Sequence, residues 1–143
     1  MTAERDRLVA AARGACGSAH APYSGIHVGV AIRSSAGATY TGTNVENAAY
    51  PLGNCAEASA IGAGVRAEGK AFRIAETAVW ALDHEGRAIA ISPCGGCRQR
   101  IHEFAENPRV SIHFPWENGE VRTASVNELL PYAFELPASR NGR

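Results

Sequence analysis

The sequence has no excess of charge of either sign. Its 14 Lys and Arg residues balance 14 Asp and Glu residues, so the formal net charge at pH 7 is zero. A protein that binds nucleic acid through its overall electrostatic field needs a basic excess or a basic stripe, and binding to an anionic membrane surface needs the same. The charge balance therefore argues against a nucleic-acid partner and against a membrane-bound role.

Long hydrophobic runs are also missing. No uncharged apolar stretch approaches the roughly 20 residues that a membrane-spanning helix needs. Residues 1–19 contain Glu4 and Asp6, and Arg13 interrupts their apolar positions, so they lack the charge order of a secretory signal peptide. We therefore expect a soluble cytoplasmic protein.

Cysteine is scarce, with 4 residues in a chain of 143. In a reducing compartment, so few cysteines are typical of metal ligands or catalytic groups rather than of a disulfide framework. The chain is long enough to bury a core without such cross-links. We expect one domain over residues 1–143, in which residues 138–143 form a loose tail.

Helical and strand patterns alternate along the chain. Helical spacing or capping signals predict helices over residues 5–20, 55–68 and about 94–106, and a helical turn at 126–130. Short segments rich in Val, Ile, Tyr and Thr predict strands at residues 27–32, 39–43, 74–82, 110–114 and 120–123. The second helix contains many small residues, which indicates close packing on a sheet. The pattern predicts a three-layer α/β/α domain with one mixed central sheet of about five strands.

Three cysteines and one carboxylate lie at two expected helix starts. Cys55 and Glu57 open the second helix, and Cys94 and Cys97 open the third. A helix N-terminus favours thiolate over thiol, and residues three apart in a helix face the same way. Three protein ligands with an open fourth position are typical of catalytic zinc, which lowers the pKa of a bound water to about 7. The sequence therefore predicts Zn²⁺ on Cys55, Cys94 and Cys97, with Glu57 carrying protons.

Two other readings of these cysteines remain open at this stage. A Cys-x-x-Cys pair also occurs in redox sites and as half of a closed zinc knuckle. A redox pair would need neither Cys55 nor Glu57. A closed knuckle would need a fourth ligand, from Cys16 or one of the 5 histidines, but Cys16 lies on an apolar helix face where we expect packing.

The order of the motifs resembles the small cytidine deaminase family. The segments that carry the resemblance are Tyr23-Ser24, Val28-Gly29, Asn44 to Gly53, Cys55-Ala56-Glu57, Ser92 to Gln99, Glu103-Phe104 and Glu128 to Pro131. Cys-x-Glu followed by Pro-Cys-x-x-Cys is also the signature of zinc deaminases that act on cytosine or adenine. The resemblance covers most of the chain. It implies a cytidine deaminase-like fold with one zinc ion per subunit, and a homotetramer that acts in pyrimidine salvage.

The resemblance also implies a reaction and roles for individual residues. Asn44 and Glu46 would bind the ribose hydroxyls, and the backbone N–H of Ala56 would meet the pyrimidine edge. Glu57 would move a proton from the zinc-bound water to N3 before hydroxide adds at C4 and ammonia leaves. Cytidine or 2'-deoxycytidine would become uridine or 2'-deoxyuridine. Phe134 would stack on the base of a neighbouring subunit, although core packing is an equal reading of this residue.

Two positions depart from the family pattern. Ala58 stands where the family often has an Arg that hydrogen-bonds the zinc thiolates, and we expect Arg98 and the helix starts to balance that charge. Ile26, between Tyr23-Ser24 and Val28-Gly29, stands where the family usually has a Phe that packs near the base, so one aromatic wall of the pocket is lost. The resemblance also makes Tyr50 a candidate for substrate binding. Asn54, just before Cys55, is expected to cap the helix.

These departures leave alternatives to cytidine as the substrate. A deaminase of a modified or different aminated nucleoside is the first alternative, because the pocket differs at Ile26 and the metal surroundings differ at Ala58. A non-catalytic zinc-binding scaffold is the second, and it predicts a closed coordination shell. Editing of a polynucleotide is disfavoured by the zero net charge.

Overall fold

The computed structural model describes residues 2–137, so the tail expected at residues 138–143 lies outside the described part of the chain. The helices are α1 (Ala3–Ala15), α2 (Ala56–Glu68), α3 (Gly95–Phe104) and α4 (Val126–Leu129). The strands are β1 (His27–Ser34), β2 (Thr39–Thr43), β3 (Ile74–Leu82), β4 (Ser111–Pro115) and β5 (Val121–Ser125). Each expected helix and strand is present, with ends that differ by a few residues.

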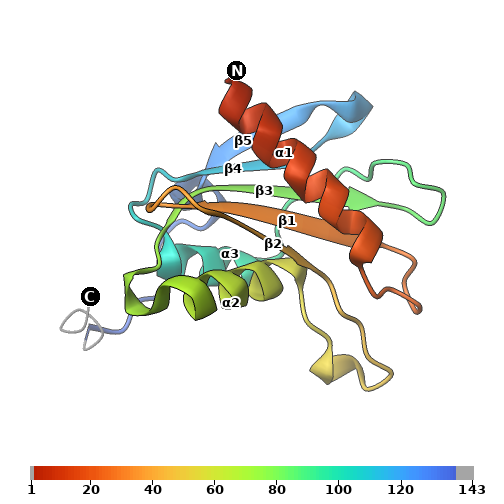
Figure 1. The fold of residues 1–143 in the computed structure, drawn as a ribbon, viewed down its shortest axis with the longest axis horizontal. Coiled ribbons are helices and arrows are strands. Elements are labelled where there is room, and N and C mark those ends of the chain that lie inside the picture. The colour runs from red at the N-terminus through yellow and green to blue at the C-terminus, as the bar shows by residue number, and fades with distance from the viewer. Residues whose placement is uncertain (1, 138–143) are drawn as a thin grey trace.

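The five strands form one sheet in the order β2-β1-β3-β4-β5. Only β3 and β4 are parallel, whereas the other neighbouring pairs are antiparallel, so the sheet is mixed. Helix α1 crosses one face of the sheet, and α2 and α3 lie on the other (Figure 1). The predicted three-layer α/β/α arrangement is confirmed.

The two faces of the sheet bury separate hydrophobic cores, because side chains alternate between the faces along each strand. Leu8 and Ala12 of α1 pack with Trp80 on one face. The larger core, on the other face, includes the fully buried Phe72 and Ile101 under α2 and α3. This larger core holds the starts of α2 and α3 against the sheet, next to the cysteines.

Small residues allow α2 to lie close to its neighbours, as its composition indicated. A Cβ atom added at Gly42 of β2 would lie 2.3 Å from the backbone nitrogen of Ala60 on α2. A Cβ atom added at Gly64 would lie 2.2 Å from a ring atom of Phe72. Both distances are far below van der Waals contact, so glycine is required at these two positions for the observed packing.

Two local expectations are wrong. The first helix ends at Ala15 and a 3₁₀ turn follows at Cys16–Ser18, whereas a helix to about His20 was expected. The backbone of His20 instead bonds that of Asn44 and Glu46, so it cannot continue the helix. Asn54 does not cap α2. Its backbone pairs with Val45 in both directions, and Cys55 is the N-cap residue without a side-chain capping bond.

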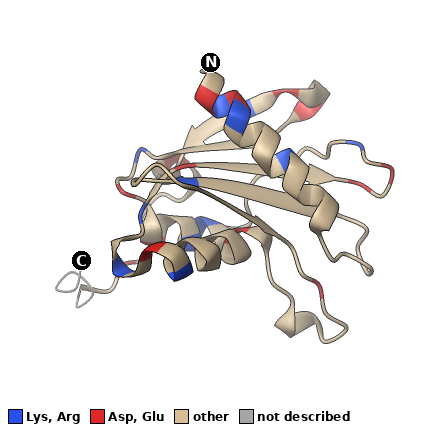
Figure 2. Ribbon diagram, viewed as in Figure 1, with Lys and Arg blue, Asp and Glu red and all other residues tan. Residues whose placement is uncertain are grey.

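Charged residues of both signs are interspersed along α1, along α2 and in the loops (Figure 2). Among residues 2–137, none of the helices combines the length and the apolar character needed to cross a membrane.

Candidate active site

Three cysteine side chains meet where α2 and α3 begin. Cys55 is the N-cap residue of α2, Cys94 is the N-cap residue of α3, and Cys97 follows in the first turn of α3. Their sulfur atoms all lie within 4.8 Å of one another. Such a triangle can surround one Zn²⁺ ion at a zinc–sulfur distance of about 2.3 Å. The donor set therefore fits zinc.

The thiols of Cys55 and Cys97 are harder to ionise than their place at helix starts suggested. Burial raises the pKa of the Cys97 thiol, and the neighbouring Glu57 carboxylate raises it further. Burial also raises the pKa of Cys55. The cost of burying a thiolate outweighs the helix dipole at these two positions, so bound zinc must displace the protons.

Among residues 2–137, no fourth protein ligand joins the three cysteines. Neither Cys16 nor any of the 5 histidines belongs to the cluster. The Cys16 thiol is fully buried on the α1 side of the sheet, and its sulfur lies 3.6 Å from each of two acceptors, the carbonyl oxygens of Ala12 and Trp80. Its expected role in packing is confirmed, and the described residues do not form a closed knuckle.

A cavity of about 430 Å³ opens beside the cysteines. Its lining residues are Ser24, Ile26, Val28, Asn44, Val45, Glu46, Tyr50, Gly53, Asn54, Cys55, Ala56, Glu57, Ile91, Ser92 and Cys94. The volume lies in the range of about 300–1,000 Å³ that is usual for small-molecule sites. The cavity thus brings two of the three cysteines together with the polar residues expected to bind ribose.

Glu57 is the buried acid of this cavity, with only 5% of its surface exposed. It lies in the first turn of α2, two residues after Cys55, and close enough to the Cys97 thiol to raise that thiol's pKa. A carboxylate between the metal ligands and the cavity can move protons between a metal-bound water and a bound molecule.

Glu46 and Asn44 stabilise the loops that surround the cavity. The Glu46 carboxylate accepts the backbone N–H groups of Tyr23 and Ser24, at 3.0 and 3.1 Å, and the Ser24 hydroxyl. The side-chain bond from Ser24, together with the backbone bonds, lowers the pKa of Glu46. The Asn44 amide accepts from Val28 N–H and donates to the Ile26 carbonyl. Each side chain keeps acceptor or donor capacity for a ligand.

Ile26, Tyr50 and Ala56 form other parts of the wall. Ile26 is 41% exposed, and Tyr50 makes an edge contact with Tyr23 at a centroid distance of 6.0 Å. Ala56 is the first residue of α2, so its backbone N–H has no intrahelical acceptor and is available to a ligand. The wall therefore combines an aliphatic side, an aromatic side and a backbone donor.

Comparisons with known proteins identify the family. The family model described as the cytidine and deoxycytidylate deaminase zinc-binding region matches residues 2–113. The chain belongs to this deaminase family. A cytidine deaminase of Sporosarcina psychrophila is 36% identical over 129 residues, which are 90% of this chain and 90% of that protein. The crystal structure of cytidine deaminase from Burkholderia pseudomallei has a TM-score of 0.77 at 38% identity, and the match covers 94% of this chain and 100% of that one.

A relative with a different named substrate is also similar. A Blasticidin-S deaminase of Bacillus cereus is 34% identical over 110 residues, which are 76% of this chain and 76% of that protein. Family membership therefore establishes a zinc-binding hydrolase of the deaminase type, and it leaves room for substrate variation.

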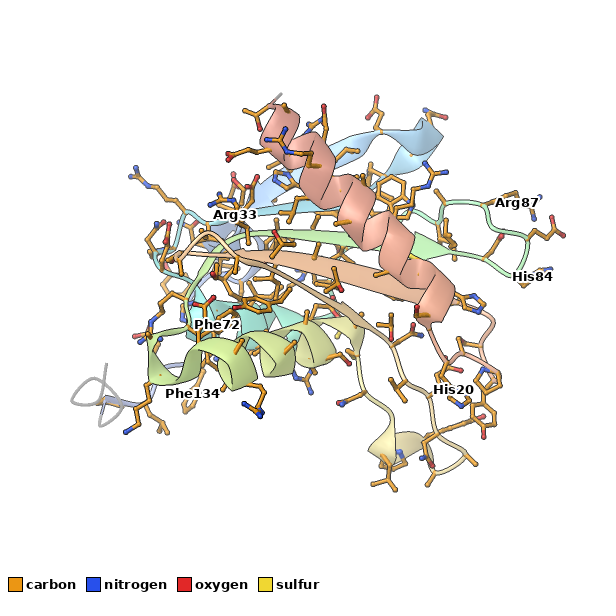
Figure 3. The ribbon with its side chains drawn as sticks, viewed as in Figure 1. His20, Arg33, Phe72, His84, Arg87 and Phe134 are labelled. Atoms are coloured by element: carbon orange, nitrogen blue, oxygen red, sulfur yellow. The ribbon has the colours of Figure 1, made fainter. Side chains whose placement is uncertain are left out.

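Phe134 does not line the cavity of its own chain in this deaminase. Its side chain is 66% exposed, and its carbonyl oxygen accepts a hydrogen bond from Gln99 on α3. Figure 3 shows Phe134 at the opposite end of the molecule from His20, which lies beside the cavity loop. Core packing within the described chain is therefore excluded as the role of Phe134.

Arg98, which was expected to help balance the thiolates, has no hydrogen bond to them among the described residues. Its guanidinium donates, at 2.8 Å each, to the Pro93 carbonyl, the Leu129 carbonyl and the Ser92 hydroxyl. It stabilises the loop before α3 and the end of α4. Sequence reasoning missed Arg100, whose Nη1 lies 3.4 Å from Cys97 Sγ. The i, i+3 spacing from Cys97 on a helix was the signal that could have identified it.

Proposed function

We propose that the chain catalyses the hydrolytic deamination of cytidine and 2'-deoxycytidine, giving uridine or 2'-deoxyuridine and ammonia. The observation that carries the proposal is one cavity lined by the zinc ligands Cys55 and Cys94, by the buried Glu57, and by Asn44 and Glu46. The family membership and the cytidine deaminases among the relatives support the same reaction.

The residues have separable roles in this proposal. Cys55, Cys94 and Cys97 hold Zn²⁺, which when bound supplies a Lewis acid that lowers the pKa of a water ligand. Glu57 would take a proton from the attacking water and deliver it to N3 of the base while the water oxygen bonds to C4. Glu57 would then move the proton of the new C4 hydroxyl to the exocyclic amino group, so that the C4–N bond breaks, ammonia leaves and the C4 carbonyl forms.

The remaining side chains position the nucleoside. The Glu46 carboxylate accepts hydrogen bonds from the ribose hydroxyls, the Asn44 amide can donate to or accept from them, and the Ala56 N–H meets the pyrimidine edge. Ile26 and Tyr50 pack against the nucleoside, because both line the cavity. The described structure leaves the base without an aromatic stacking partner at position 26.

A nucleoside assay tests the reaction. Purified zinc-loaded protein should lower the ultraviolet absorbance of cytidine or deoxycytidine and release one ammonia per product. Glu57→Gln, with the same zinc content, should lower kcat by about 100- to 10,000-fold, the usual contribution of a general acid–base group. Absence of turnover of both nucleosides by the parent protein would overturn the proposal.

A second candidate substrate is a modified cytidine or another aminated nucleoside. Ile26, 41% exposed on the cavity wall, and the similarity to a Blasticidin-S deaminase favour it. A panel of aminated nucleosides, scored by ammonia release, separates the candidates by kcat/KM. If Ile26→Phe shifts the preference toward cytidine, the aliphatic wall sets the choice of base.

A non-catalytic zinc scaffold was the alternative from another class. It predicts a closed shell of four protein ligands, and the described residues bring together three. Zinc-loaded protein that deaminates no aminated nucleoside of the panel would favour the scaffold.

We also propose that the protein is a homotetramer that acts in pyrimidine salvage in the cytoplasm. Phe134 is exposed, together with Tyr132 and Leu136, and does not reach its own cavity, which supports stacking on the base of a neighbouring copy. A reducing compartment would keep the three cysteines available to zinc. Light scattering coupled to size-exclusion chromatography should give a mass of four subunits.

A further inference from the structure

The zinc centre implied by this site carries a net negative charge. Three thiolates around Zn²⁺ leave one net negative charge, and the Glu57 carboxylate lies next to Cys97. Cys97 and Glu57 are both buried. Negative charge in a buried position is costly unless a cation or hydrogen-bond donors balance it. At position 58, on the first turn of α2, the side chain is Ala and supplies neither.

Arg100 lies where such a cation is needed. It is on α3, one turn after Cys97, and its guanidinium Nη1 donates to Cys97 Sγ at 3.4 Å. The guanidinium lies against Gly96, where an added Cβ atom would be in ordinary van der Waals contact with Arg100 Nη1 at 3.5 Å and would lie 4.0 Å from Cys94 Sγ. The guanidinium therefore lies beside the Cys-x-x-Cys turn.

Arg98 does not compete for this role. Its three hydrogen bonds go to the neutral oxygens of Pro93, Leu129 and Ser92. Among the described residues, Arg100 is the basic side chain with a hydrogen bond to a sulfur of the cluster.

We propose that Arg100 is a positioning residue that balances the negative charge of the zinc–thiolate centre. The proposal rests on the zinc site of the proposed function. By donating to Cys97, Arg100 stabilises the thiolate form that binds zinc and withdraws electron density from the sulfur, which leaves the metal a stronger Lewis acid. Because Arg100 is exposed, salt should screen part of this effect.

Zinc binding tests the proposal without any substrate. Arg100→Met removes the charge at similar length, Arg100→Gln keeps a neutral donor, and Arg100→Lys keeps the charge. Arg66→Met removes an exposed Arg from the last turn of α2 and is the matched control. Competition with a chromophoric chelator measures zinc affinity, and circular dichroism verifies that each zinc-free variant is folded like the parent.

The expected order of zinc affinity follows from charge. Arg100→Met should bind zinc about 10- to 100-fold more weakly, the usual effect of removing a group that contacts a metal ligand. Arg100→Gln should lie between Arg100→Met and the parent, Arg100→Lys near the parent, and Arg66→Met should match the parent. The difference between parent and Arg100→Met should shrink as ionic strength rises to about 1 M.

Cobalt substitution supplies a second measurement, at the metal itself. The thiolate-to-cobalt charge-transfer band should shift in Arg100→Met and Arg100→Gln and remain unchanged in Arg66→Met. If Arg100→Met does not fold, Arg100→Gln is compared with Arg100→Lys by the same two measurements.

Equal zinc affinity of the parent, Arg100→Met and Arg100→Gln would overturn the role of Arg100, whatever the enzyme's activity. A protein that shows the expected order of affinities but deaminates no nucleoside would instead overturn the proposed function and leave the role of Arg100 standing. The two failures are therefore distinguishable.

Discussion

At the scale of single residues, Glu46 combines a structural and a binding role. Two backbone N–H groups and a hydroxyl from Tyr23 and Ser24 hold its carboxylate. These bonds, the one from the Ser24 side chain first, lower the pKa of Glu46, so the carboxylate stays ionised to a lower pH than an ordinary Glu. A fixed anion on the cavity wall is suited to accept hydrogen bonds from sugar hydroxyls.

Glu46→Gln should therefore lower kcat/KM for cytidine about 10- to 100-fold, mainly through KM, since the lost bond contributes to substrate binding. Deamination of free cytosine, which has no ribose, should change much less. Ser24→Ala is the control, because it removes one hydrogen bond to the Glu46 carboxylate and leaves the charge of Glu46 in place.

Because the pKa of Glu46 is lowered, the KM of the parent protein should not rise as pH falls from about 8 to about 5. Equal losses with cytidine and cytosine would contradict the ribose role.

At the scale of elements, helix α2 contains two glycines, one beside open space and one packed against a buried ring. A Cβ atom added at Gly62 meets nothing within 4 Å, whereas one at Gly64 would collide with the buried ring of Phe72. Gly62→Ala should stabilise the protein by about 0.5–1 kcal/mol through helix propensity. Gly64→Ala should destabilise it by about 1–3 kcal/mol through overpacking. Urea unfolding of the two variants checks both signs, and a stabilising Gly64→Ala would show that α2 does not lie against Phe72 as described.

Strands β1, β3, β4 and β5 are joined by a chain of polar side chains, in which His113 is buried and Glu76 is half-buried. Glu76 accepts from Arg33 on one oxygen and contacts His113 Nε2 at 2.6 Å on the other, and His113 Nδ1 contacts Thr123. Burial alone would raise the pKa of Glu76, but the bonds with His113 and Arg33 lower it below its ordinary value. A lowered folded-state pKa means that Glu76 stabilises the fold above its unfolded-state pKa, about 4.3.

Glu76→Gln should therefore reduce the free energy of unfolding at pH 7 by about 1–3 kcal/mol. The difference from the parent should shrink as pH falls through the lowered folded-state pKa of Glu76, because the parent then loses the same interaction. Denaturant unfolding of the parent and of Glu76→Gln at a series of pH values measures this difference in the free energy of unfolding. Glu85→Gln removes a carboxylate from an exposed ion pair with Arg87 and should have little effect at any pH. A loss that stays constant below about pH 4 would contradict the assignment.

At the scale of the whole molecule, the cavity of one chain lacks Phe134, which is exposed and is not among the residues that line it. If a second copy supplies that ring, as we propose, subunits with different defects should complement one another. Glu57→Gln lacks the proton carrier and Phe134→Ala lacks the stacking ring, which in other proteins contributes about 1–3 kcal/mol per base.

Co-expression of the two variants with different tags allows mixed oligomers to be isolated. A Phe134→Ala subunit beside a Glu57→Gln subunit keeps its own Glu57 and receives an intact Phe134. We expect the mixed oligomer to be more active per intact Glu57 than pure Phe134→Ala. Activity equal to the average of the two pure variants would contradict stacking across an interface.

Local patterns in the sequence determined the positions of the helices and strands, the zinc ligands and the family resemblance. Apolar periodicity and breakers located the strands and helices, because the spacing of buried side chains is a local property. The motifs at Cys55 and Cys94 located the zinc ligands and the acid, because Cys55 and Glu57 lie within one helix turn, as do Cys94 and Cys97. The family resemblance also followed from residues that are contiguous or nearly so.

Only the tertiary structure decided how groups far apart in sequence interact. Asn54 pairs with Val45, Arg98 bonds Leu129, and Arg100, rather than Arg98, contacts the sulfur of Cys97. Neighbours in sequence on a helix point about 100° apart, so the choice between Arg98 and Arg100 depended on the packing of α3. The raised pKa of Cys97 has the same origin, since burial is a property of the folded chain and outweighs the helix start that the sequence displays.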